Sequence, residues 1–448
     1  MLGTGFLSKN NLVLAALLSF AGFMNPPEAF AQTDEMPRDF WARCSEANRI
    51  LALTRAGFDP KMEVSIHLGL DALKKQQTVD GSWGTKMKVG TTALALMALF
   101  GHGETPLSPA YGECVRKGVK WLNAMPVAGA KANEILKGEA LELLGMGDWE
   151  FAMGTAALAE YATLSRDATV HPLVHASAEL LVRQQLPTGG WGPTAKPTRG
   201  WADGDAAALG DICRTGWAVQ ALVAVKKAGQ APQGTEAAIE KAQEFVNALT
   251  RSNGLMGCRK AAAKNATSED IWRTAVGVFI LDQPSRSSAT NSAIAAKALS
   301  YILKETDANG LRKSKGHNYD YPLQVAIGSP MRMLPSQSQH TMELGSYYYA
   351  AIAGRLAGSE TWQRARSRYI LPVLKSQSQD GTWPVEGDSW SPPFNIINMD
   401  VMLDNFKDAA YRNAACLLIC ETPYRIIPKL DEGFFKKVNV PAIPAIPK

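Results

Sequence analysis

A recurring pattern of glutamine, glycine and tryptophan constrains the fold of this chain more than any other feature of its sequence. Three segments have the form Q-x-x-x-G-x-W, and they begin at Gln77, Gln185 and Gln377. An aliphatic residue stands four positions before each glutamine: Leu73, Leu181 and Val373. Self-similarity at a spacing of tens of residues indicates a repeat architecture, in which each unit buries its apolar face against its neighbours.

Weaker copies fill the intervals between the three clear ones. The segments that begin at Lys241 and Lys297 lead to Gly254 and Gly310 in the same frame, and one that begins at Lys117 keeps only the front half. With these copies counted, the unit recurs roughly every 60 residues. The chain therefore contains six copies of one unit.

The chemistry of the motif indicates a structural role. A helix is expected to end near each glutamine, because glycine permits the left-handed backbone that follows many helices. The tryptophan covers apolar surface between adjacent units while its N–H finds an acceptor. The glutamine side chain is suited to bridging backbone groups at a neighbouring helix terminus.

A second recurring element follows each copy. It is apolar almost all round and rich in small residues, as expected of a helix buried on every side. Its aligned first residues are Thr91, Thr155, Thr215, Thr274, Ala350 and Asn413. The motif helices carry more Lys, Glu and Gln and are expected to lie outside. The sequence thus predicts an all-α fold, an (α/α)6 toroid of six helical-hairpin repeats over residues 32–430.

The two ends of the chain differ from the repeats. Residues 1–31 are predicted to be a signal peptide, with Lys9, an apolar run over 12–24 and the small-x-small pattern of residues 29–31. That run is shorter than the ~20 residues of a membrane span, although an uncleaved anchor is the alternative. The tail, 431–448, is rich in proline and is expected to be extended.

Composition and charge limit the location and partners of the protein. No transmembrane segment is expected after signal removal, so we predict a secreted or periplasmic protein of the cell envelope. The net charge is only +5 over 448 residues, without a dense Lys/Arg run, which argues against nucleic-acid binding. Protein partners and oligomeric state are not indicated by the sequence.

Six cysteines allow disulfides in an oxidising compartment, and core packing is the alternative. They are Cys44, Cys114, Cys213, Cys258, Cys416 and Cys420. Their spacing is irregular and lacks the C-x-x-C pattern of structural zinc sites.

The glutamine–tryptophan repeats resemble the QW motifs of squalene-hopene cyclases, in the superfamily of terpenoid cyclases and prenyltransferase β subunits. The resemblance covers roughly residues 60–430 and is strongest to exported bacterial prenyltransferase and squalene-oxidase repeat proteins of unknown function. It implies the α/α toroid, whereas activity does not follow, because one fold hosts many functions.

The chain departs from the cyclases at their acid motif, D-x-D-D-T. The matching stretch is 211–215, where Asp211 and Thr215 are retained while Cys213 and Arg214 replace the other two aspartates. A thiol beside a fixed cation is expected to tend towards thiolate, which is the wrong acid for an alkene. Cyclisation started by protonation is therefore disfavoured.

The zinc set of the prenyltransferases is also incomplete. Cys258 and His340 are present, but no Asp-x-Cys pair accompanies them, and tyrosines 347–349 lie where the zinc-binding histidine is expected. We therefore predict no metal and no cofactor. Whether the protein is an enzyme stays open.

One group of charged residues remains. Arg214, Arg273 and Arg412 each precede the aligned first residue of an inner helix, and Asp211, Asp270 and Asp408 lie three or four positions before them. Equivalent positions on inner helices lie around one mouth of a toroid, so these charges should converge there. Glu150 and Glu343 are further candidates. One interpretation is helix caps and ion pairs.

The other interpretation is a ligand site. Arginine binds carboxylate or phosphate with two parallel hydrogen bonds, and aromatic residues would line the apolar depth below. The ligand-binding candidates are Asp211, Cys213, Arg214, Trp217, Asp270, Arg273, Tyr348, Asp408 and Arg412. Trp272 and Phe279 would extend the apolar lining, and core packing is the alternative for every aromatic residue.

Three functional hypotheses follow. The leading one is a toroid that binds a hydrophobic or isoprenoid-like ligand, or a partner. The second is an enzyme on the same fold, acting on isoprenoids or on glycans through Asp211 and Asp270. The third is a structural or protein-binding scaffold. An adjacent arginine lowers a carboxyl pKa, which counts against a general acid.

Overall fold

The computed structural model describes residues 38–85, 87–124, 148–192, 210–258, 268–284, 288–305, 342–383, 388–389 and 408–428. The predicted signal peptide, the proline-rich tail and His340 lie outside the described residues. Among the described residues, no helix combines the length and apolar character that a membrane crossing requires.

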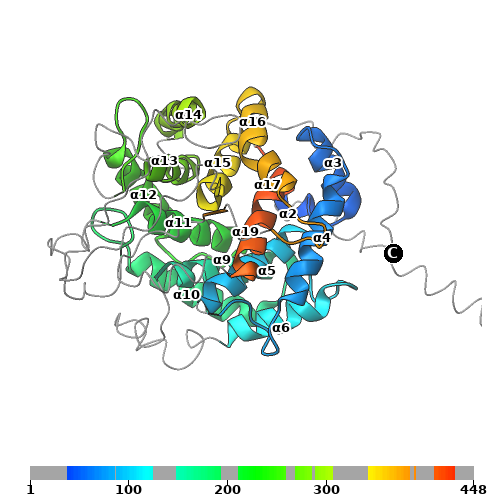
Figure 1. Ribbon diagram of the computed structural model, residues 1–448. Helices are drawn as coiled ribbons and strands as arrows, with labels where there is room; N and C mark the ends of the chain where they lie inside the picture. Colours follow the sequence, from blue (N-terminus) through cyan, green and yellow to red (C-terminus); the bar gives the residue numbers. More distant parts are fainter. Residues whose placement is uncertain are drawn as a thin grey trace, which may run out of the picture.

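An inner ring of six helices forms the centre of the described chain (Figure 1). The helices are α5 (Lys88–Gly101), α9 (Asp148–Ser165), α11 (Ile212–Lys227), α13 (Ser268–Leu281), α15 (Leu344–Leu356) and α19 (Ala409–Cys420). Each helix packs against the next, and α19 packs against α5, so that the ring is closed. In α5 every residue from Val89 onward is buried, as predicted for a helix surrounded on all sides.

An outer ring surrounds the inner one. It contains α4 (Met62–Lys75), α6 (Gly112–Asn123), α10 (His171–Arg183), α12 (Thr235–Leu249) and α14 (Ser288–Glu305), and its sixth position is occupied by α16 (Ser359–Ala365), η5 (Arg366–Ile370) and α17 (Leu371–Lys375). These helices bury one face only. In α6, for example, Val115 and Leu122 are buried, while Arg116 and Lys117 are exposed. The predicted α/α toroid is confirmed.

The Q-x-x-x-G-x-W motif joins neighbouring outer helices. Gln77 donates to the carbonyl of Gly81 in its own turn and to that of Cys114 on α6, both at 2.9 Å. Gln185 donates in the same way to Gly189 at 2.8 Å and to Ala238 on α12 at 2.7 Å. Each glutamine thus bridges two helices, as the sequence predicts.

The glycine and tryptophan complete the joint. Gly81 has a φ of 92°, and a Cβ there would lie 2.7 Å from the Lys117 carbonyl oxygen, so only glycine fits without strain. The indole N–H of each motif tryptophan donates at 2.8 Å to the aliphatic residue that precedes the glutamine by four positions. This explains why the aliphatic position recurs at a fixed distance.

The last joint closes the ring. Gln377 donates to Gly381 at 3.1 Å and to the carbonyl of Ser65 on α4 at 2.8 Å. A Cβ on Gly381 would collide with the Leu68 carbonyl oxygen, also on α4. The sixth repeat therefore contacts the first through the same chemistry that joins the internal repeats.

The structure corrects the alignment of the inner helices in one repeat. In four repeats the structure shows the backbone N–H at the motif tryptophan, or at its equivalent position, donating to a side chain near the start of an inner helix. The acceptors are Thr92, Thr215, Thr274 and Asn413. Thr92, not Thr91, is therefore the equivalent residue in the first repeat. The adjacent Thr91 made the two choices indistinguishable from sequence.

Short elements complete the described fold. Helices α2 (Arg38–Trp41), α3 (Glu46–Arg55) and α20 (Thr422–Arg425) pack together at the C-terminal ends of the inner helices. The 3-10 helix η3 (Ala168–Val170) precedes α10, and two-residue strands β1 (Met342–Glu343) and β2 (Asp388–Ser389) pair in parallel. We call the N-terminal ends of the inner helices the mouth, and the end covered by α2, α3 and α20 the floor.

Candidate functional site

The mouth brings the starts of the inner helices together. Asp408 accepts a hydrogen bond from the N–H of Thr85, just before α5, at 3.0 Å. Glu150 on α9 accepts one from the N–H of Gly90 on α5 at 2.8 Å. The N–H of Ile212 donates to the Cys258 carbonyl, in the connection towards α13, at 3.1 Å. The predicted charged positions thus occupy one end of the toroid.

Asp211 is a helix cap. It precedes α11, and its Oδ1 accepts from the N–H groups of Cys213 and Arg214 at 2.9 and 3.1 Å. Its Oδ2 accepts from the Cys258 thiol at 3.1 Å and lies 3.8 Å from the Arg214 guanidinium. Since both oxygens are engaged and the residue is 3% exposed, Asp211 is poorly placed to act as a general base.

Cys213 is a neutral thiol, which corrects the sequence-based expectation of a thiolate. Burial raises the pKa of Cys213 well above its usual value, and Asp211 and Cys258 raise it further. Arg273 and Arg214 act in the opposite direction but do not outweigh them. The sequence showed the cation beside the thiol but not the burial. A thiol of raised pKa is an even weaker proton donor to an alkene, so the conclusion about cyclisation is unchanged.

The arginines differ in exposure. Arg214 and Arg412 are buried, whereas Arg273 is partly exposed. The Thr215, Thr274 and Asn413 contacts show that the three arginines occupy equivalent positions on their helices. Arg214 and Arg273 each interact electrostatically with Cys213, so both lie near the corner formed by α11 and α13.

The other candidates at the mouth have separate surroundings. Asp408 caps α19 through the N–H groups of Ala410 and Tyr411, at 3.0 and 3.2 Å. Asp408 is therefore a cap like Asp211, as the first interpretation expects. Asp270 lies on α13 and Glu343 on β1, but their side chains are outside what the structure describes.

Aromatic side chains fill the axis of the toroid below the mouth. Trp217 on α11 stacks on Tyr348 of α15, with ring centroids 6.1 Å apart and planes inclined by 13°. Tyr349 packs edge-on against Trp217 and also contacts Phe279. Helices α11 and α15 are not neighbours in the ring, so this contact crosses the interior. The aromatic candidates therefore pack against one another, and their predicted ligand role stays a prediction.

A polar contact continues this filling towards the floor. Gln220 on α11 donates to the Tyr348 hydroxyl at 3.0 Å, and its Nε2 lies 4.0 Å from the sulfur of Met97 on α5. Three alternate inner helices thus meet on the axis. We call Met97, Gln220 and Tyr348 the axial hub. In the described part of the chain, side chains occupy the centre of the ring.

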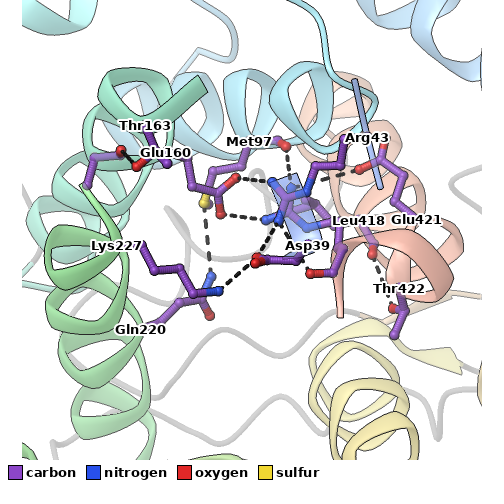
Figure 2. A network of polar contacts seen from close by, with 12 residues as sticks. Asp39, Arg43, Met97, Glu160, Thr163, Gln220, Lys227, Leu418, Glu421 and Thr422 are labelled. Carbon is purple, nitrogen blue, oxygen red and sulfur yellow. Dashed lines mark hydrogen bonds and ion pairs between the residues drawn. The ribbon is translucent and has the colours of Figure 1, made fainter. Parts of the chain in front are cut away.

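A buried ionic network lies at the floor, and sequence analysis missed it (Figure 2). Glu160 on α9 accepts from Arg43 at 3.1 Å and from Arg425 at 2.6 Å. Arg425 also donates to the Met97 carbonyl at 2.6 Å. Asp39 pairs with Arg43 at 3.2 Å and with Lys227 at 2.7 Å. These contacts hold α2 and α20 against the inner ring.

Two acidic residues of the network, Asp39 and Glu421, have pKa values shifted in opposite directions. Burial alone raises the pKa of Asp39, but Lys227 and Arg43 lower it below its usual value. Burial raises the pKa of Glu421 well above its usual value, although Arg425 lies 4.0 Å away. Within the network only Asp39–Arg43 and Glu421–Arg425 are close in sequence, each four residues apart, and the contacts that join these pairs to Glu160 and Lys227 span more than a hundred residues, so no motif indicated the network.

A third group, also missed, lies beside the floor. Glu63 and His67 on α4 and His102 at the end of α5 place one ligand atom each within 4.8 Å of the others. The only sequence signal was the four-residue spacing of Glu63 and His67, which puts both on one helix face. His102 joins them only because α4 and α5 form a hairpin.

Comparisons with known proteins agree with the fold. Residues 66–252 match the family model of a domain of unknown function, DUF6288. No curated protein matches the chain.

Two solved structures are similar over most of their length. A type II terpene cyclase from Scytonema, MstE, with geranylgeranyl dihydroxybenzoate as substrate, aligns with a TM-score of 0.51 at 11% identity, covering 81% of this chain and 97% of its own. An inactive variant of an α-1,6-mannanase from a Salegentibacter species, with α-1,6-mannotriose, aligns with a TM-score of 0.52 at 11% identity, covering 81% and 99%. At these identities the likeness concerns the α/α toroid alone.

Proposed function

We propose that this protein is an exported toroid that binds a small amphipathic acid at its mouth and does not cyclise it. The observation that carries the proposal is the arrangement at the α11–α13 corner. Arg214 and Arg273 lie on equivalent positions of adjacent helices, and Arg214 precedes Trp217 of the Trp217–Tyr348 stack by three residues, less than one helical turn. A cationic rim over an apolar aromatic surface suits a ligand with an anionic head and a flat apolar part.

The filled axis limits the size of the apolar part. Trp217 and Tyr348 are 1% and 3% exposed, and Gln220 and Met97 continue the filling of the axis beyond them. A long isoprenoid chain would have to displace these side chains, so the proposal is confined to a ligand whose apolar part is no larger than one isoprene unit or an aromatic ring. The ligand of the Scytonema cyclase joins a benzoate to a geranylgeranyl chain, so the proposed ligand resembles its head more than its tail.

Binding is favoured over catalysis at this corner. Both oxygens of Asp211 are engaged, and Cys213 is a protonated, buried thiol. The glycan-active alternative depends on Asp211 as well, so the same engagement argues against it. A protein-binding scaffold is the second candidate, because the axial hub and the floor network make the described core solid and rigid.

Binding of a matched pair of compounds tests the proposal. The mature chain is titrated calorimetrically with 3-prenyl-4-hydroxybenzoate and with its uncharged carboxamide. We expect the acid to bind, the amide to bind more weakly, and Arg273→Gln to weaken the acid about tenfold, since a charge-assisted hydrogen bond contributes roughly 1.5–3 kcal/mol. Arg183→Gln, on the exposed face of α10, is the matched control and should change neither affinity.

Two results would contradict the proposal. Equal binding of acid and amide would remove the role of the arginines. The second result is that neither compound binds, and that native mass spectrometry of protein purified from its own host releases no small molecule. The scaffold would then be the better hypothesis.

A further inference from the structure

The side chains of Glu63, His67 and His102 form a compact group beside the floor, away from the proposed ligand site. Glu63 and His67 are four residues apart on α4, and His102 is the C-cap residue of α5. Glu63 is 2% exposed and His102 is fully buried, while His67 is partly exposed. One side of the group is therefore accessible from solvent.

The second ring nitrogen of His102 is held by a carboxylate. His102 Nδ1 lies 2.7 Å from Glu104 Oε1, so that Nε2 faces Glu63 at 3.0 Å. Metal-binding histidines almost always donate their other N–H to such an acceptor, which orients the ring and raises its basicity. The His67 ring packs edge-on against His102, with centroids 4.5 Å apart.

The two oxygens of Glu63 have different surroundings. Arg49 Nε donates to Oε1 at 2.5 Å, and Arg49 Nη1 is directed to the carbonyls of Arg43 and His102. Oε2 is buried and has no hydrogen-bond partner among the described residues. A buried carboxylate oxygen without a partner costs free energy unless a cation or proton occupies the adjacent space.

We propose that Glu63, His67 and His102 bind a divalent transition-metal ion of the zinc class. Glu63 Oε2, one nitrogen of His67 and His102 Nε2 supply three ligands, and water takes the remaining position on the exposed side. Two imidazoles and one carboxylate suit zinc, whereas calcium and magnesium prefer oxygen ligands.

The site would connect three elements. α4 supplies two ligands and α5 one, and Arg49 from α3 fixes the carboxylate. Metal binding should therefore stabilise the first hairpin of the ring together with the short helices that cover the floor.

Zinc binding by the full mature chain tests the inference. Protein stripped with a chelator is titrated with zinc chloride against a chromogenic competitor, and thermal unfolding is followed in parallel. We expect one equivalent to bind and to raise the Tm. His67→Ala should weaken binding at least tenfold and remove the Tm increase. Since His67 is partly exposed, this variant should fold.

Two variants serve as controls. His175→Ala, at an exposed histidine on outer helix α10, should bind zinc as the wild type does. Glu104→Gln keeps all three ligands and should weaken zinc binding ten- to a hundredfold through the orientation of His102. Cobalt substitution distinguishes cysteine binding, because thiolate ligands give intense charge-transfer absorption and these ligands do not.

Any of three outcomes overturns the site. These are no uptake of zinc by the wild type at micromolar concentration, full affinity retained by His67→Ala, and thiolate absorption of bound cobalt at one equivalent. The group would then be a hydrogen-bonded cluster around Glu63 that holds no metal ion.

Discussion

Substitution of Gln377 provides a direct test of ring closure. Its Nε2 donates to Gly381 at 3.1 Å and to Ser65 at 2.8 Å, and alanine removes both hydrogen bonds. The joint is half-buried, so water can reach part of it, and we use the net value of about 1 kcal/mol for each bond. Gln377→Ala is therefore expected to lower the free energy of unfolding by about 2 kcal/mol.

Comparison with an internal joint makes the test specific. Gln185 donates to Gly189 and Ala238 at 2.8 and 2.7 Å, so Gln185→Ala should cost the same amount. In a closed ring the two joints are equivalent, whereas in an open array residue 377 would have no partner on α4. Gln379→Ala, at an exposed position in the same turn, is the matched control and should cost less than about 0.5 kcal/mol.

Equilibrium urea unfolding of the mature chain, followed by tryptophan fluorescence, measures these differences. A cost for Gln377→Ala no larger than that of Gln379→Ala, with the full cost retained for Gln185→Ala, would show that the ring is open in solution. The reasoning from the closing joint would then be refuted.

Three further predictions concern the glycine, the buried thiol and the buried acid. Gly81→Ala should destabilise the protein more than Gly229→Ala in urea unfolding, because both have positive φ but only Gly81 faces a carbonyl oxygen at 2.7 Å; equal costs would mean that the close approach is unimportant. Cys213 should resist alkylation at pH 8 in the folded protein and react fully in urea, as read by peptide mass spectrometry, since its pKa is raised by burial. Glu421→Gln should raise stability at pH 7 but not at pH 4. Burial raises the folded-state pKa of Glu421 well above 4.5, so above that pH the folded chain retains a proton that the unfolded chain releases. The wild type therefore loses stability as the pH rises, and glutamine removes this loss. Unfolding curves of wild type and variant at the two pH values check this, and a gain confined to pH 4 would contradict it.

The ring was predictable from sequence because its joints are local and repeated. Glutamine, glycine and tryptophan make the same contacts in each clear copy, so that spacing alone identified the outer helices. The inner helices followed from their small, apolar residues. Among the four repeats that this contact tests, the choice of Thr91 over Thr92 was wrong, because two adjacent threonines fit the pattern equally well.

The contents of the ring were less predictable. Trp217 and Tyr348 were identified as inward-facing, but whether they line a cavity or meet depends on the ring's diameter, which no local pattern encodes. The thiolate expectation for Cys213 failed because sequence shows neighbouring charge but not desolvation. The floor network and the His67 group each bring together segments that are distant in sequence, so the short spacings within them did not identify either group.

The contact between Gln377 and Ser65 has a consequence for how the chain reaches its native state. The first outer helix cannot bury its remaining face until the sixth repeat has been synthesised, since its partner is some 300 residues further along the chain. Until then the early repeats expose an apolar edge to solvent, and C-terminal truncation leaves that edge permanently without its partner. Shortened forms should therefore aggregate rather than persist as smaller stable proteins.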